Sequence, residues 1–164
     1  MRMSNDQKYI FLADCENPGN FSNCNLRVLS ELEQTTAKIN YTIKINGVLK
    51  EFDVLDIDMV VALTNDNKIQ IYIINGETYE QVTDLGSILP VNSASKLCNL
   101  HVCPKSKLIG LSVCTTKAIG MDPVFEKIML FCVNKKITDP ASGKFRVELK
   151  KLYHMELKLF AKPT

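Results

Sequence analysis

Apolar and polar residues alternate along residues 54–77, in two runs that are separated by a polar turn. The alternating apolar residues are Leu55, Ile57, Met59, Val61 and Leu63 in the first run, and Ile69, Ile71 and Ile73 in the second. A period of two is typical of a β-strand with one buried face. The turn contains Asn65, Asp66 and Asn67, which tolerate turn conformations. The pattern therefore predicts a hairpin in which residues 54–63 pair with residues 68–74.

Two further pairs of apolar runs repeat this form. They are KYIFLAD (8–14) with NLRVLSEL, as far as Ser30, and KLIGLSVC (107–114) with EKIMLFCVN (126–134). A loop at 15–24 separates the members of the first pair. The first run of each pair begins near Lys8, Val54 or Lys107, so the spacing is 46 and then 53 residues. A repeat of about 40–50 residues with several strands is typical of a propeller blade, which has four antiparallel strands.

Other apolar runs supply the remaining strands of these units. They are GVLKEFDVLDID, KLCNLHVCPKS and FRVELKKLYHMELKL. We therefore expect residues 1–164 to form a single all-β domain of about three antiparallel β-propeller blades: part of a first blade, a second from about Gly47 to Ser95, and a third from Lys96 onward. Closed propellers have at least four blades, so this partial propeller is a fragment of a larger one or closes with other chains. A β-sandwich is the alternative, because evenly spaced short strands fit it too.

Two segments are also compatible with a helix. In residues 22–38, Leu26, Leu29 and Leu32 recur at helical spacing, but we expect a strand up to Ser30. In FRVELKKLYHMELKL, seven of the eight odd positions from 145 to 159 are apolar. That period of two predicts a strand with one apolar face, and a basic amphipathic helix is the competing interpretation.

The composition is that of an ordinary globular protein, with 46% hydrophobic and 23% charged residues. No apolar run approaches the roughly 18 residues that cross a bilayer, and the apolar patch before Asp14 is too short for a signal peptide. The six cysteines are mostly inside apolar runs. We therefore expect a cytoplasmic protein with reduced cysteines, of which Cys98, Cys114 and Cys132 are buried on sheet faces.

Charge is distributed unevenly along the chain. Residues 51–84, the acidic band, carry eight acidic groups and one lysine, and residues 134–164, the basic end, carry eight basic and three acidic groups. These segments are either solvated sheet edges or surfaces that attract a partner. Nucleic-acid binding requires basic residues interleaved with aromatic ones. The basic end has only a few such residues, so we do not expect a nucleic-acid partner. They are Lys150, Lys151, Tyr153, His154 and Lys158.

Catalytic motifs are absent from the sequence: there is no phosphate-binding loop, no nucleophile elbow and no zinc-protease motif. The densest cluster of reactive residues is Cys98, His101 and Cys103. On a regular strand, Cys98 points to one face while His101 and Cys103 point to the other, so four converging zinc ligands are not expected. A nucleophilic Cys103 beside His101 lacks an evident acidic or amide partner.

Asp56 and Asp58 are predicted to share one face of a strand, about 7 Å apart. They are a carboxylate pair, a cation site with Asp53 nearby, or the solvated outward face of that strand. We expect the last case, and therefore predict no catalytic, cofactor-binding or metal-binding residues, no cofactor and no small-molecule substrate.

The order of the strands resembles a known family. MVVALTNDNKIQIYIINGETYEQVTDL, then KLCNLHVC, KLIGLSVC, EKIMLFCVNKK and FRVELKKLYHMEL are similar to the citron-homology domain, in the form found at the N-terminus of vacuolar-sorting tethering subunits of the HOPS and CORVET complexes. The resemblance covers residues 45–158 and rests on strand order and apolar character.

A second family resembles the N-terminal part. YIFLADCENPGNFSNCNLRVLSEL followed by KINGVLKEFDVLDIDMVVALTNDNKIQIYII is similar to propellers of the large damaged-DNA-binding and cleavage-and-polyadenylation-specificity subunits. In that family Gly-Thr usually ends the first strand, whereas this chain has Ala13-Asp14.

Both resemblances imply a β-propeller that binds proteins and has no catalytic activity. The first implies a non-enzymatic interaction module in vesicle tethering and endolysosomal trafficking. Its expected partners are other subunits and a small GTPase, with peripheral association with endosome or vacuole membranes. The second implies a scaffold in a nuclear complex for mRNA 3′-end processing, splicing or ubiquitin ligation.

Overall fold

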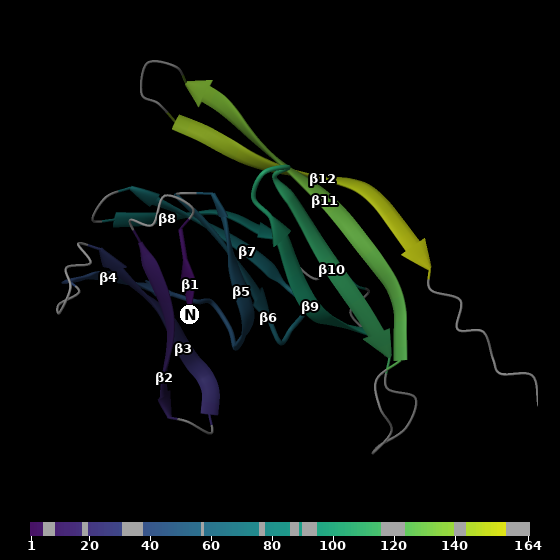
Figure 1. Cartoon of the computed structure of the whole chain (residues 1–164), viewed down its shortest axis with the longest axis horizontal. Helices are drawn as coiled ribbons and strands as arrows, with labels where there is room; N and C mark the ends of the chain where they lie inside the picture. Colours follow the sequence, from purple (N-terminus) through teal and green to yellow (C-terminus); the bar gives the residue numbers. More distant parts are fainter. Residues whose placement is uncertain are drawn as a thin grey trace, which may run out of the picture.

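The computed structural model describes residues 1–4, 9–17, 20–30, 38–56, 58–75, 78–85, 89, 95–115, 124–139 and 144–156. Every regular element assigned in these ranges is a β-strand and none is a helix, so the all-β prediction is confirmed. The strands form three antiparallel sheets of four strands each (Figure 1). In every sheet the spatial order of the strands follows their order in the chain.

Each sheet uses a continuous part of the chain. Sheet 1 contains β1 (Arg2–Met3), β2 (Ile10–Asn17), β3 (Asn20–Ser30) and β4 (Lys38–Lys44). Sheet 2 contains β5 (Leu49–Asp56), β6 (Met59–Thr64), β7 (Ile69–Asn75) and β8 (Thr78–Leu85). Sheet 3 contains β9 (Ser95–Cys103), β10 (Leu108–Thr115), β11 (Val124–Asp139) and β12 (Lys144–Glu156). Sheets 2 and 3 begin within two residues of Gly47 and Lys96, where the second and third blades are expected to start.

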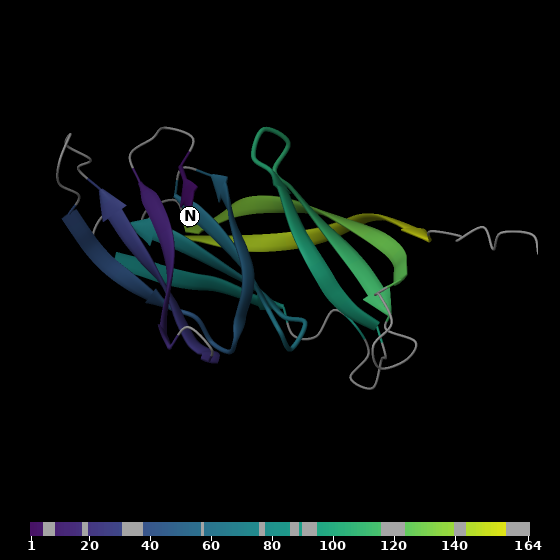
Figure 2. The same ribbon diagram turned by 60° about the horizontal axis from the view of Figure 1, so that its bottom comes forward.

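Sheet 2 lies between the other two sheets (Figure 2). One apolar cluster joins its first face to sheet 1, and contains Phe11, Leu26, Val28, Ile43, Phe52, Val54, Val60, Ala62 and Tyr72 among others. A second cluster joins its other face to sheet 3, and contains Leu55, Met59, Val61, Leu63, Ile71, Ile109, Leu111, Met129 and Phe131 among others. All six residues of β6 are therefore buried.

The central hairpin of sheet 2 is the predicted one over β6 and β7, where Val61 pairs with Ile71. Its turn has Asn67 in the left-handed region, with φ of 62°, which asparagine tolerates better than most residues. The prediction of one strand over 54–63 is wrong, because the chain reverses near Asp58 and Val54 pairs with Val60. The alternation continues through this turn because residues on both sides of it pack into one cluster.

The structure also tests the loop predicted at 15–24 and the two segments that were compatible with a helix. The expected loop at 15–24 is mostly strand, since β2 runs to Asn17 and β3 starts at Asn20, with 18–19 outside the described residues. The strand interpretation of residues 22–30 and 145–156 is confirmed, and the helix alternatives are wrong there. The competing helical positions 31–37 and 157–160 lie outside the described residues.

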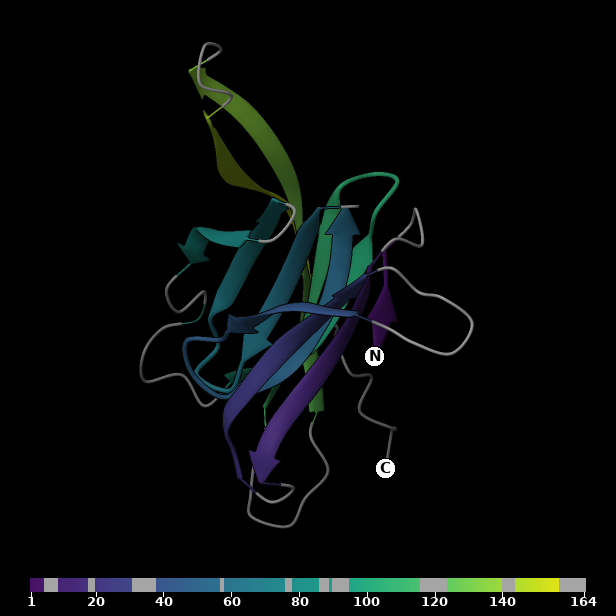
Figure 3. The same cartoon turned by 90° about the vertical axis from the view of Figure 1, so that its left-hand side faces the viewer.

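The odd positions of β12 do not share one face. Val147 pairs with Lys135 and is buried against sheet 2, but a bulge between Leu130 and Phe131 inserts an extra residue into β12. Because one inserted residue reverses the alternation of side chains, Tyr153 and the residues after it change face. Figure 3 shows β11 and β12 continuing beyond the other strands as a long two-stranded arm.

A buried polar network fixes the connection between sheets 1 and 2. Gln70 is 0% exposed. Its side-chain amide donates to the carbonyl of Asn46 at 2.5 Å, and its oxygen accepts from the Asn46 N–H at 3.2 Å and from the Tyr72 hydroxyl at 2.5 Å. Buried polar groups are costly without partners, so these bonds hold the connecting segment against β7. Gly47, with φ of 111°, provides its positive-φ turn.

Candidate interaction surface

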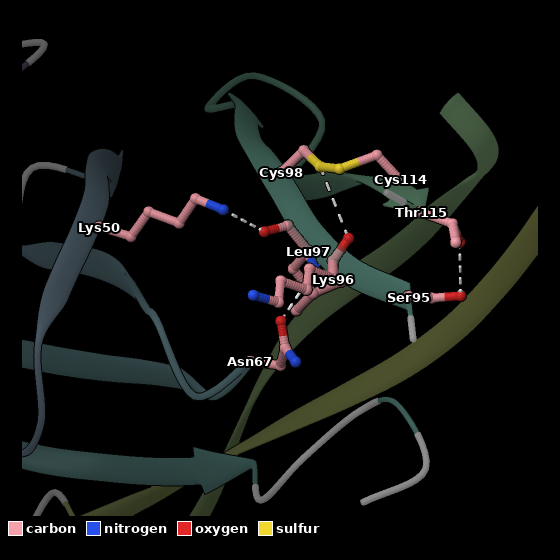
Figure 4. The surroundings of a disulfide bond; sticks show 8 residues. All are labelled: Lys50, Asn67, Ser95, Lys96, Leu97, Cys98, Cys114 and Thr115. Carbon is pink, nitrogen blue, oxygen red and sulfur yellow. Dashed lines mark hydrogen bonds between the residues drawn. A yellow bond between two sulfur atoms is a disulfide. The ribbon is translucent and has the colours of Figure 1, made fainter. Parts of the chain in front are cut away.

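Side chains of sheet 2 bind the backbone of β9, the first strand of sheet 3. Lys50 donates from Nζ to the carbonyl oxygen of Leu97 at 2.5 Å, and the Leu97 N–H donates to Asn67 Oδ1 at 2.8 Å (Figure 4). Glu51 accepts from the Leu100 N–H at 2.7 Å. Because β9 is an edge strand, its outer N–H and C=O groups have no strand partner. The two sheets are therefore joined by polar bonds as well as by apolar packing.

Burial at this junction lowers the pKa of the Lys50 ammonium. The positive charge of Lys96 lowers it further, and the negative charge of Glu51 opposes the change. The cause is that the charged form loses part of its hydration and lies near another cation. No sequence pattern singled out Lys50 or Glu51, which are charged residues within the apolar run GVLKEFDVLDID.

Asp56 and Asp58 do not form a carboxylate pair on one strand. Asp56 ends β5 and Asp58 lies in the following turn, so the prediction that they share a strand face is wrong. Each carboxylate instead forms an ion pair with a lysine: Asp56 with Lys107 of the β9–β10 turn at 2.5 Å, and Asp58 with Lys135 of β11 at 3.0 Å. All four side chains are 26–40% exposed, so water weakens these pairs.

The two ion pairs border a small cavity between sheets 2 and 3. Its volume is about 130 Å³, and it is lined by Leu55, Asp56, Met59, Lys107, Val133 and Lys135. Since Asp58 belongs to the acidic band and Lys135 to the basic end, part of each charged segment is used within the chain. Lys150 and Lys151 are exposed and remain accessible to a partner.

Cys98 and Cys114 form a disulfide (Figure 4), so the prediction of six free thiols is wrong. A bulge between Ser112 and Val113 on β10 leaves Cys98 as the extra residue of β9. That register places the two cysteines on neighbouring strands with their Cα atoms 6.1 Å apart. Cys114 is buried as predicted, whereas Cys98 is only partly buried.

The other cysteines are not paired where they are described. Cys103 is free and exposed, and Cys132 is free and only partly buried, contrary to the predicted burial. Cys15 and Cys24 lie opposite each other in the β2–β3 strand register, but their side chains lie outside the described residues.

His101 and Cys103 are both exposed and lie on one face of β9, as predicted. The pKa of the Cys103 thiol is below its usual range, because the backbone N–H and then the hydroxyl of Ser106 donate hydrogen bonds to it, with a smaller contribution from Lys105. These groups belong to the turn after β9. They account for the lowered pKa without His101.

No group of three or more His, Cys, Asp or Glu side chains in the described part of the chain is arranged to hold a metal ion. Nor do the described ranges contain a helix that is long and apolar enough to cross a membrane.

The largest exposed apolar side chains gather on β1 and β12. They are Met1, Met3, Leu152, Tyr153 and Met155, which are between 41% and 79% exposed. The sequence pattern did not single out Tyr153 and Met155 as exposed, because their odd positions place them in the same period-two run as the buried Val147. Lys158 and the side chain of His154 lie outside the described residues.

Comparison with protein-family models and with curated proteins finds no match to this chain. The two family resemblances therefore stay expectations drawn from the strand pattern.

Proposed function

We propose that this chain is a non-enzymatic protein-interaction module of a multisubunit assembly, built from three β-propeller blades. The observation that carries the proposal is the stacking of three consecutive four-stranded antiparallel sheets, with the middle sheet covered on both faces. Propeller blades have this strand order and pack in this way. A β-sandwich has two packed layers, whereas this chain has three.

The pathway we propose is vesicle tethering in endolysosomal trafficking. It rests on the resemblance of residues 45–158 to citron-homology domains of tethering subunits. The partners are then other subunits of the complex and a small GTPase, at the cytoplasmic surface of endosomes or vacuoles. The alternative is a propeller scaffold of a nuclear complex, which rests on the resemblance of the N-terminal part to the damaged-DNA-binding and polyadenylation-specificity propellers.

The local chemistry supports binding over catalysis. The carboxylates of Asp56 and Asp58 are engaged in ion pairs with lysines. Ser106, a turn residue, is the main cause of the lowered pKa of Cys103. Function is therefore expected on the exposed surfaces, above all at the exposed Lys150 and Lys151 of β12.

The test is affinity purification of the tagged chain from its own cells at low salt, followed by mass spectrometry. We expect subunits of one membrane-tethering assembly to co-purify in stoichiometric amounts. Subunits of an RNA-processing or ubiquitin-ligase complex would select the alternative. If no protein co-purifies stoichiometrically at any salt concentration, the interaction-module proposal is wrong.

A charge-reversed variant locates the surface. Lys150→Glu with Lys151→Glu should reduce partner capture, most strongly at low salt, because surface charges act mainly on the association rate. The matched control is Lys44→Glu with Lys105→Glu, which changes two exposed lysines outside the basic end. Equal loss in both variants would show that the effect is one of net charge and not of the β12 surface.

A further inference from the structure

Each outer sheet has one covered face and one open face. Sheet 2 covers one face of sheet 1 and one face of sheet 3, through the two apolar clusters. The open face of each outer sheet is formed by the residues that alternate with those of the cluster, because successive side chains of a strand point to opposite faces.

The open face of sheet 3 carries apolar side chains of β11 and β12, beside small residues of β10 and the exposed His101 of β9. In the register of the sheet, Gly110 pairs with Leu130 and Leu130 with Tyr153, while Ser112 pairs with Ile128 and Ile128 with Met155. Leu130 and Ile128 are only partly buried, and Tyr153 and Met155 are 56% and 41% exposed. The bulge in β12 brings these two large side chains onto this face.

Two of the residues that β10 contributes to this face, Gly110 and Ser112, are small. A Cβ added at Gly110 would lie 3.4 Å from the Leu130 side chain, which confirms that the two share the face. Small residues in a strand allow another element to approach closely. Gly110 therefore lies between the apolar Leu130 of β11 on one side and His101 of β9 on the other, and a second sheet can approach the face closely at β10.

The open face of sheet 1 also carries apolar residues. Met3, which is 51% exposed, pairs with Ile10, and Ile10 pairs with Leu29. Leu12 is partly buried and pairs with Arg27, which forms an ion pair with Asp14. This face is thus apolar near β1 and polar near the far end of β2.

We propose that the open face of sheet 3 packs against the open face of sheet 1 of a second copy of this chain, so that two copies form a closed ring of six sheets. The contact continues the stacking already present, because sheet 2 packs against sheets 1 and 3 with the same strand order. A contact between two different faces repeats until a ring closes or a filament grows. Six blades lie within the usual range of about 4–8 for closed propellers, and two copies leave no open face.

The first experiment is light scattering of the purified chain, on its own, across the micromolar range. The expected species is a dimer of about 37 kDa, which is twice the 18.5 kDa of one chain. Tyr153→Asp with Met155→Asp should weaken the dimer by about 10- to 100-fold, because two charges enter an apolar contact. Both side chains are exposed in the single chain, so circular dichroism should show an unchanged fold.

A matched control adds the same charge elsewhere. Asn65→Asp with Gln81→Asp changes one exposed residue of the β6–β7 turn and one of β8 and should leave the dimer intact. Met3→Asp should weaken the dimer from the other side of the same contact. Mixing the Met3→Asp chain with the Tyr153→Asp/Met155→Asp chain leaves one unaltered interface, so the mixed dimer should form more tightly than either variant dimerises alone.

A wild-type chain that stays monomeric over the whole range would overturn the proposal, as would a dimer that survives both face variants. A dimer that is lost in both variants but not restored by mixing would mean that like faces meet, which also contradicts the ring. None of these outcomes bears on the tethering partners, which are tested in cell extracts and not with the purified chain.

Discussion

Strands β7 and β11 are both central strands of four-stranded sheets, yet they differ in how they are buried. From Ile69 to Ile74 every residue of β7 is at most 4% exposed. In β11, Met129, Phe131 and Val133 are buried, while the residues between them are only partly buried. The difference follows from position, because sheet 2 has a neighbour on both faces and sheet 3 has one on a single face. Both strands read as apolar runs, so hydrophobicity alone does not reveal how many faces are covered.

The largest effect expected from this comparison is on stability. Ile71 is 0% exposed in the cluster between sheets 2 and 3, so Ile71→Ala should cost about 2–5 kcal/mol of unfolding free energy. Ile128 is on the open face and partly exposed, so Ile128→Ala should cost about 1 kcal/mol. Urea unfolding measures both, in the monomeric Tyr153→Asp/Met155→Asp background. Equal losses would show that the open face is covered within a single chain.

The disulfide should provide the next largest effect. It joins β9 and β10 at a sequence separation of 16, and closing a loop of that size is expected to contribute about 3 kcal/mol. Cys98→Ser with Cys114→Ser should therefore lower the midpoint of urea unfolding, whereas Cys103→Ser with Cys132→Ser should change it little.

Alkylation of the unfolded, unreduced protein checks the same bond by mass spectrometry. Cys103 and Cys132 should be labelled, and Cys98 and Cys114 only after reduction. The same measurement on protein isolated from cells, with its free thiols blocked at lysis, also tests the proposed cytoplasmic location, because disulfides are rare in a reducing cytoplasm. Labelling of Cys98 and Cys114 without reductant would contradict the bond.

The smallest expected effect is the pH dependence of the β6–β7 turn. Although partial burial opposes it, hydrogen bonds from Lys68 and Thr64 lower the pKa of Asp66 below its usual 3.8. A carboxyl whose pKa is lowered by folding adds stability above its unfolded pKa, and this contribution is lost as the pH falls through the folded pKa. Asp66→Asn should therefore be less stable than wild type near neutral pH, with the difference shrinking in acid.

Thermal unfolding of both proteins from neutral pH into acid measures this difference. Thr64→Val is the matched control, since it removes one hydrogen bond to Asp66 and keeps the carboxylate. If the difference between Asp66→Asn and wild type is the same at every pH, the folded state does not lower the pKa of Asp66.

The sequence by itself determined the class of fold and the central hairpin. Period-two alternation predicts strands because successive side chains of a strand point to opposite faces, and Asn67 supports the turn because it tolerates positive φ. The apolar runs that precede Val54 and Lys107 placed the starts of sheets 2 and 3 within two residues. These properties are local, so they can be read along the chain.

Only the tertiary structure decided which residues meet. Asp56 and Asp58 are close in sequence, but a chain reversal gives each a different lysine partner. A single inserted residue in β12 moves Tyr153 and Met155 away from the face of Val147, although all three fit one period. A bulge likewise places Cys98 beside Cys114. Turns, bulges and sheet stacking depend on pairing between distant strands. An alternation of apolar residues does not specify which strands pair or in which register.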